Sequence, residues 1–129
     1  LALSATDRVR LAERLARGSM RQRHLRMDTS GLEILPTVTK KPGEVMAALL
    51  LATLAFRGPE EGEPGVVRVR CSERDNLRTW LFEVEPVSLP SAGGFGMLSE
   101  VCGRNGWQLR SGEGSVAIVL SKDGTDARG

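Results

Sequence analysis

Aromatic residues are scarce in this sequence, which has no Tyr, two Trp and three Phe among 129 residues. Proteins that bind single-stranded nucleic acid stack the bases on aromatic side chains, so this composition argues against such a platform. The formal net charge of +2 at pH 7 does not call for a nucleic-acid or membrane partner. No apolar run reaches the roughly 18 residues of a membrane-spanning helix, and no signal peptide is visible. We therefore expect a cytoplasmic protein that contacts neither nucleic acid nor membrane.

Cysteine and histidine are also rare. Cys71 and Cys102 are far apart in the sequence, and His24 is the only histidine. This pattern argues against a metal site built from cysteine and histidine. It predicts two buried, reduced thiols. His24 begins an alternating stretch, residues 24–28, that predicts a strand with one buried face, and we expect the histidine to be structural.

The apolar residues that are present suffice for one core, at 40% of a chain whose length suits a single domain. Residues 9–16 repeat apolar positions at helical spacing, and Gly18 is the predicted end of that helix. Residues 45–56 are almost wholly apolar and predict a buried helix, with Pro42 in its first turn.

The second half of the chain predicts two hairpins separated by a helix. Residues 66–71 and 77–85 form the first hairpin, in which every second side chain of the latter strand is apolar. A glycine-rich loop at residues 91–96 then leads into a helix from Met97 that Gly106 ends. Residues 107–110 and 116–120 form the second hairpin. The elements predict an α+β fold, a two-layer sandwich with helices on one face of the sheet.

We expect residues 1–121 to form this one domain and the polar residues 122–129 to be a frayed tail. Charge is distributed unevenly along the chain. Residues 1–26 contain seven arginines but only two acidic residues, Asp7 and Glu13. Two interpretations remain open for this basic helix. It is either a solvated helix face or a docking surface for another domain.

Three segments carry a family resemblance: residues 35–45 before the apolar helix, residues 82–90 at the end of a strand, and residues 93–101. Together they resemble the catalytic ATP-binding domain of bacterial sensor histidine kinases, which belongs with the gyrase and Hsp90 ATPases. The resemblance extends from about residue 9 to residue 120. It implies a Bergerat-type fold with a mixed, mostly antiparallel sheet and about three helices on one face.

The first segment matches the start of the family's N-box helix, which normally presents Asn side chains to Mg²⁺ and triphosphate. The two usual Asn positions fall on Leu51 and Ala55, and neither side chain can bind a metal. Arg57 is a candidate positive charge near the phosphates, and Glu44 a candidate metal-facing carboxylate. The alternative for both is a solvated residue at a helix end.

In the second segment the family has a strand that ends in Asp-x-Gly-x-Gly, whose Asp accepts a hydrogen bond from the adenine amino group. Glu85 stands in that place, so the resemblance implies that it contacts the base. Residues 86–88 lack the glycines that follow in the family. The alternative is a strand-end Glu exposed to water.

The third segment resembles the family's second glycine box and contains Gly93, Gly94, Phe95, Gly96 and Met97. Glycine lets phosphate approach the backbone closely, and the helix that follows offers free N–H groups and a positive dipole end. A glycine-rich loop alone is weak evidence, and the alternative is a plain loop with a helix cap. Few residues precede it where the family has a lid, so we expect weak nucleotide binding and slow turnover.

The resemblance implies that the chain binds ATP with Mg²⁺ and passes the γ-phosphate to a His on a dimerisation domain N-terminal to residue 1. A response regulator and a second copy of the full-length protein are the other implied partners. Two alternatives keep the fold without efficient catalysis: a pseudokinase, and an anti-sigma-like interaction module in which the basic helix is the contact face.

Overall fold

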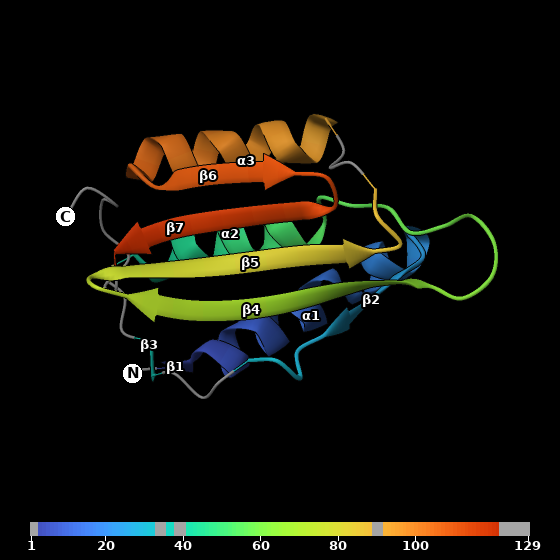
Figure 1. Ribbon diagram of the computed structural model, residues 1–129, viewed down its shortest axis with the longest axis horizontal. Helices are drawn as coiled ribbons and strands as arrows, with labels where there is room; N and C mark the ends of the chain where they lie inside the picture. The colour runs from blue at the N-terminus through green and yellow to red at the C-terminus, as the bar shows by residue number, and fades with distance from the viewer. Residues whose placement is uncertain (1–2, 33–35, 38–40, 89–91, 122–129) are drawn as a thin grey trace.

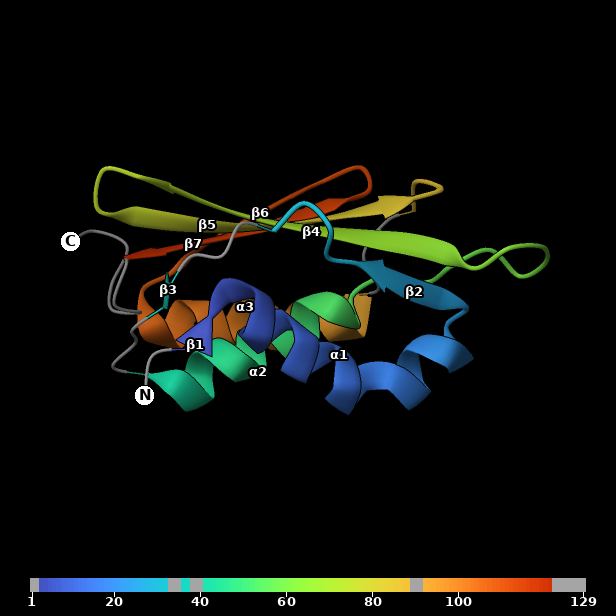
Figure 2. The same ribbon diagram turned by 90° about the horizontal axis from the view of Figure 1, so that it is seen from below.

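Three helices cover one face of a five-stranded sheet in the computed structural model, which describes residues 3–32, 36–37, 41–88 and 92–121. Figure 1 looks onto the open face of the sheet, and Figure 2 shows the helices in a separate layer beneath it. The helices are α1 (Ala5–Gln22), α2 (Pro42–Thr53) and α3 (Ala92–Asn105). This arrangement confirms the predicted two-layer α+β fold.

The strand order in the sheet is β2-β4-β5-β7-β6. β2 (Leu25–Asp28) pairs in parallel with β4 (Gly65–Arg74), and the other pairs are antiparallel. β4 and β5 (Leu77–Glu85) form the first predicted hairpin, closed by a turn in which Asp75 has a φ of 57°. β6 (Gln108–Gly112) and β7 (Ser115–Ser121) form the second, with Gly114 at a φ of 69°.

Period-two alternation along β5 positions the core. Trp80, Phe82 and Val84 are buried on the helix side, as predicted, and they pack with the inward residues of α2 such as Leu49. Successive side chains of a strand point to opposite faces of the sheet. The residues between them therefore lie on the open face, and Glu83 is one of these.

The first helix is longer than predicted. α1 continues past Gly18 to Gln22, because Met20 on the next turn packs into the core and Gly18 is on the solvent side. The helix ends where His24 adopts a left-handed φ of 56°. His24 therefore precedes β2 instead of beginning it, and its ring donates through Nδ1 to the Pro59 carbonyl. That bond is a structural one.

The glycine-rich loop was also predicted wrongly, because residues 92–96 are helical and form the first turns of α3. The side chains of Phe95 and Leu98 pack against the core, and this packing offsets the low helix propensity of glycine. α3 ends as predicted at Gly106, which has a φ of 70°. A small sheet formed by β1 (Leu3–Ser4) and β3 (Pro36–Thr37) was not predicted, since two-residue strands have no periodicity.

The central helix, α2, has no polar face. Its inward side buries Val45, Ala48, Leu49 and Ala52, and the remaining apolar side chains are half-buried. An apolar helix of this kind is normally surrounded by protein. No helix in the described ranges is both long and apolar enough to cross a bilayer. The predicted tail, residues 122–129, lies outside the described residues.

Both cysteines are free and buried, as predicted. Burial raises the pKa of the Cys71 thiol from 9.0 to about 12 and that of Cys102 to about 11. Because only the thiolate reacts quickly, we expect no reaction of the folded protein with Ellman's reagent at pH 8. Both thiols should react after unfolding in guanidinium chloride. Rapid reaction of either thiol in the folded protein would contradict this packing.

Candidate functional site

The end of α2, the end of β5 and the start of α3 lie at the same end of the molecule (Figure 1). The Ser88 hydroxyl donates a hydrogen bond of 3.2 Å to the Arg57 carbonyl, which joins the segment after β5 to the segment after α2. Nearby, the Val84 N–H donates to the Gly114 carbonyl at 2.8 Å. The structure therefore brings Arg57 to the end of the sheet from which the chain leads into the glycine segment.

The glycine segment contributes the first turns of α3. The first four N–H groups of an α-helix have no acceptor within the helix, so those of residues 92–95 point outward from its start. Gly96 is exposed, and no described atom lies within 4 Å of the position that a Cβ would take there. Met97 is 58% exposed, while Phe95 is half-buried against the core. This helix start can accept an anion without a steric barrier at Gly96.

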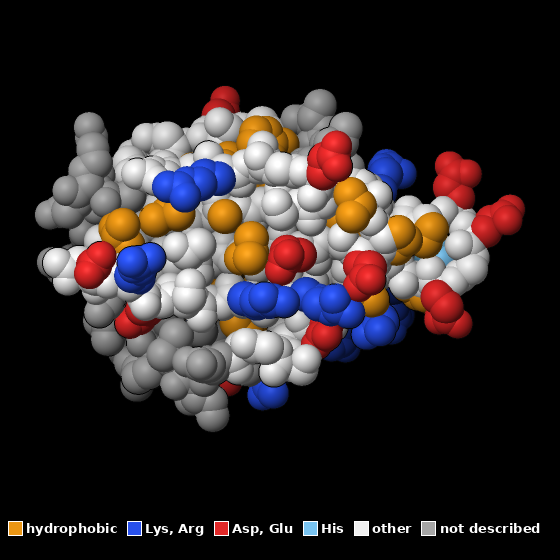
Figure 3. Space-filling model, viewed as in Figure 1, with side chains coloured by type: hydrophobic (Ala, Val, Ile, Leu, Met, Phe, Trp, Pro, Cys, Tyr) orange, Lys and Arg blue, Asp and Glu red, His pale blue; other side chains and the backbone are white. Residues whose placement is uncertain are grey.

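The charge at this end is mixed. Arg57 is exposed, but the loop that follows it carries three exposed glutamates, Glu60, Glu61 and Glu63. Acidic side chains gather at the right-hand tip of the molecule in Figure 3. The loop repels anions only over about the Debye length, which is about 8 Å at physiological salt.

Glu85 lies on the opposite face of the sheet from the helices. Its carboxylate forms an ion pair of 2.9 Å with Arg68 of β4, next to the pair that joins Arg70 to Glu83. Figure 3 shows basic and acidic side chains side by side across this open face. The structure thus does not bring the Glu85 carboxylate to the helix side, where the glycine segment begins.

Glu44 lies at the other end of the helix layer. Its carboxylate accepts hydrogen bonds from Arg104 at 2.8 Å and from Asn105 at 2.7 Å, both in the last turn of α3. α3 has 14 residues and is therefore about 20 Å long, so this whole length separates Glu44 from the glycine segment. The carboxylate fastens α2 to α3. Asn105, which also accepts a bond from Lys41, was not predicted, because its partners lie about 60 residues away.

The hydrogen bonds from Arg104 and Asn105 lower the pKa of Glu44 below its ordinary value of 4.5. A carboxyl group whose pKa is lowered by folding stabilises the protein above its unfolded pKa, and this stability is lost as the pH falls through the folded pKa. We expect Glu44→Gln to melt below the parent at pH 7, with a difference that shrinks below pH 4.5. Glu113→Gln, in an exposed turn, is the control. A pH-independent difference for Glu44→Gln would contradict the proposed ion pair.

The described residues do not fit a magnesium ion. Leu51 is half-buried on α2, and Ala55 is fully buried. Among the residues that the structure describes, no three His, Cys, Asp or Glu side chains are grouped so that they could hold a metal. Magnesium requires oxygen ligands, and neither Leu51 nor Ala55 supplies one.

No protein-family model and no curated protein matches the sequence. Solved structures do match. The histidine kinase AdeS of Acinetobacter baumannii superposes with a TM-score of 0.66 at 11% identity, over 95% of this chain and 66% of that one. The nucleotide-free catalytic domain of the histidine kinase ThkA gives 0.64 at 12% identity, over 95% and 97%. The domain has the fold of histidine kinase catalytic domains.

A third match is full-length ShkA in complex with AMPPNP, with a TM-score of 0.64 at 13% identity. It covers 92% of this chain but only 30% of ShkA. The chain therefore spans nearly all of the ThkA catalytic domain, about two thirds of the AdeS structure and less than a third of ShkA.

Proposed function

We propose that this chain is the ATP-binding catalytic domain of a two-component sensor histidine kinase. In this proposal it passes the γ-phosphate of ATP to a His on a separate dimerisation domain and works with a response regulator in a homodimeric protein. Its fold supports the proposal, since AdeS, ThkA and ShkA are histidine kinases. The observation that carries the proposal is the glycine-rich start of α3, where Gly96 and Met97 are exposed and which lies at the same end of the molecule as Arg57.

The phosphates are placed over the first turn of α3. Backbone N–H groups of residues 92–95 donate to phosphate oxygens, and the positive end of the helix dipole favours their charge. Gly96 leaves room for this approach, because no described atom adjoins its Cβ position. Arg57 supplies the nearby positive charge. Phe95 positions the segment by anchoring the helix to the core.

The adenine base is placed beside Met97, whose exposed apolar side chain can cover one face of the ring. The exposed side chain of Val87, after β5, instead lines a hollow with Arg68 and Glu85 on the open face of the sheet. Glu85 can accept a bond from the adenine amino group only by leaving Arg68 and reaching around the edge of the sheet. Glu44 acts in this proposal only by holding the two helices together.

Magnesium normally neutralises charge on the transferred phosphate, but the residues at the usual Asn positions do not fit it. We therefore assign no step to the metal. Charge on the triphosphate is offset here by Arg57 and by the start of α3. Nucleotide binding should accordingly be weak and independent of Mg²⁺, and phosphate transfer slow.

A second candidate is a pseudokinase or an anti-sigma-like interaction module. The observation in its favour is that Leu51 and Ala55 are apolar while Glu44 is held by Arg104. In this function the domain keeps the fold but transfers no phosphate. Binding of ATP without any hydrolysis or transfer would favour it over the kinase.

Gly96→Asp should weaken the binding of a fluorescent ATP analogue by about ten-fold or more, which is about 1.4 kcal/mol. The reason is repulsion between the new carboxylate and the phosphates. The change should not unfold the protein, since an acidic residue near a helix start is favourable. Gly103→Asp is the matched control, because Gly103 lies in the same helix and has equal space around its Cβ position.

Fluorescence titrations with and without Mg²⁺ provide the test. The absence of binding by the parent domain at millimolar nucleotide would rule out the kinase. Equal weakening by Gly96→Asp and Gly103→Asp would show that the phosphates bind elsewhere.

A further inference from the structure

The outer side of the helix layer carries an apolar surface that the fold does not use. On α1, Leu11 is 37% exposed and Leu15 is 62% exposed, while Val9, Ala12 and Ala16 face the core. The two leucines are four residues apart, so they stand one above the other on the helix surface. Both are large apolar side chains exposed to solvent, because other residues already form the buried face of α1.

The neighbouring helix continues this surface. Positions 43, 47, 50 and 54 follow each other at helical spacing on the side of α2 opposite its buried residues, and three of them are Ala47, Leu50 and Leu54. All three are half-buried, and no charged residue occurs from Val45 to Phe56. A helix that is apolar all round is normally enclosed by protein. Among the described residues, elements enclose α2 on its sheet side and on the sides of its two neighbouring helices, but none covers its outer side (Figure 2).

The leucines of α1 border α2. The opposite flank of α1, with Glu13 and Arg17, lines a groove against β2, so Leu11 and Leu15 lie on the flank toward α2. Met46 is on the matching flank of α2, since Glu44 on the other flank bonds α3. We call this patch the α1–α2 surface; it consists of Leu11, Leu15, Met46, Ala47, Leu50 and Leu54.

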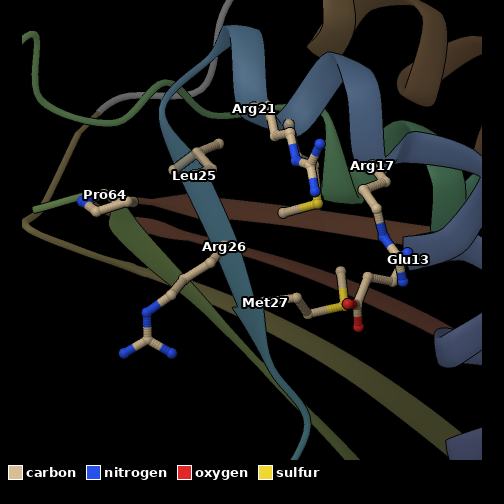
Figure 4. A pocket seen from close by; sticks show the side chains of 8 residues that line it. Glu13, Arg17, Arg21, Leu25, Arg26, Met27 and Pro64 are labelled. Carbon is tan, nitrogen blue, oxygen red and sulfur yellow. The ribbon is translucent and has the colours of Figure 1, made fainter.

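A row of arginines runs along α1 between the α1–α2 surface and the groove against β2. Arg10, Arg14, Arg17 and Arg21 are all exposed and follow each other at intervals of four, three and four residues, which places them on one stripe of α1. Within the described residues, none of the four is joined to a carboxylate by an ion pair. Figure 4 shows Arg17 and Arg21 on the α1 wall of the groove against β2, whose volume is about 300 Å³. Four like charges so placed repel one another, and Glu13, which lies beside Arg17 in the groove wall, offsets this repulsion only in part.

We infer that the α1–α2 surface is a docking site for an acidic amphipathic helix of a partner protein. The seam between two packed helices suits a third helix laid along it. The leucine-type side chains of that helix would cover Leu11, Leu15 and Leu50. Its carboxylates, at the same intervals of four, three and four residues, would pair with the arginine row over about 16 Å. This role lies outside the nucleotide site and does not depend on nucleotide binding.

A membrane fits the observations less well. A helix that lies in a bilayer surface buries a broad apolar face in it. The broad apolar face of α1 is in the protein core, and the outward apolar surface of this helix consists of its two leucines, Leu11 and Leu15. The arginines also form a single row to one side of the apolar surface, as the carboxylates of one helix would require.

The test uses the 129-residue chain and a fluorescein-labelled peptide of about 22 residues, long enough to be helical. The peptide has Leu at helical spacing on one face and Glu along the adjoining flank. Its control has the same composition in an order that mixes the two kinds of residue around the helix. Fluorescence anisotropy measures binding, and added salt should weaken it.

We expect saturable binding that the double variant Leu11→Ser, Leu15→Ser weakens by about ten-fold or more. Arg14→Glu with Arg17→Glu should weaken it by about five-fold or more, since reversed charges repel the glutamates. Arg110→Glu, an exposed charge reversal on β6, should leave binding unchanged. Unchanged melting temperatures would show that these surface variants fold.

Four results would overturn the inference. The first is no saturable binding, and the second is equal binding of the control peptide. The third is binding by the chain to phosphatidylserine vesicles that Leu11→Ser, Leu15→Ser abolishes, because the occupant is then a membrane. The fourth is a dimer in analytical ultracentrifugation that Leu15→Glu dissociates, because the surface is then filled by a second copy of the chain.

Discussion

Gly58→Ala should destabilise the protein by about 3 kcal/mol or more, among the larger effects of a single substitution. A Cβ at this position would lie 1.9 Å from the His24 carbonyl oxygen and 2.8 Å from its carbon. That carbonyl cannot move away easily. It accepts a hydrogen bond from the Gly65 N–H, and His24 itself is held in a left-handed conformation. The Gly58 N–H also donates to the Arg23 carbonyl at 2.7 Å.

The matched control for Gly58→Ala is Gly18→Ala. Gly18 lies in the exposed face of α1, and no described atom lies within 4 Å of its Cβ position. Alanine is the better helix former, so this change should stabilise the protein by up to about 1 kcal/mol. Equilibrium unfolding in urea measures both. If Gly58→Ala proved as harmless as Gly18→Ala, the chain after α2 would not run against His24 as described.

Ala55→Asn should destabilise the protein by about 3 kcal/mol, although the resemblance to histidine kinases places asparagine at this position. Ala55 is fully buried next to Phe56. The larger side chain has to displace its neighbours, and its amide loses water without a partner supplied by the core. The effect should appear as a lower midpoint in urea at an unchanged slope.

Leu51→Asn is the control for Ala55→Asn, since it introduces asparagine at the other usual Asn position. Leu51 is only half-buried, so the amide stays hydrated and the cost should be about 1 kcal/mol. Neither variant should gain Mg²⁺-dependent nucleotide binding, because one asparagine is not a metal site. Equal stabilities of the two variants would contradict the burial of Ala55. A stable Ala55→Asn protein that binds Mg²⁺ with ATP would restore the usual metal role of α2.

The fold was largely predictable because the alternation of apolar residues along β4 and β5 is long and regular and because α2 is one long apolar run. The prediction failed at two glycine positions for one physical reason. Gly18 was predicted to end a helix and residues 91–96 to form a loop before one, but the burial of Met20 and Leu98 holds Gly18 and residues 92–96 in helices. Such packing depends on residues distant in the sequence, so local propensity cannot reveal it.

The site was less predictable. The alternation that buries Trp80, Phe82 and Val84 also places Glu85 on the open face of the sheet, so the sequence already contained a signal for its orientation. Glu44 is different, because its partners Arg104 and Asn105 are set by the packing of α2 against α3. Of the predicted residues, the structure places Arg57 and the glycine segment at the same end of the molecule. Their role toward nucleotide stays a prediction.

The most direct measurement is an NMR titration of the ¹⁵N-labelled domain with ATP in the absence of Mg²⁺. The amide resonances of Gly94, Phe95, Gly96 and Arg57 should shift in proportion to occupancy, and inorganic triphosphate should shift the same glycine amides. Shifts confined to Arg68, Glu85 and their neighbours would show that the nucleotide binds the open face of the sheet. This result would contradict its proposed position at the start of α3. No shift at millimolar ATP would contradict nucleotide binding by the domain.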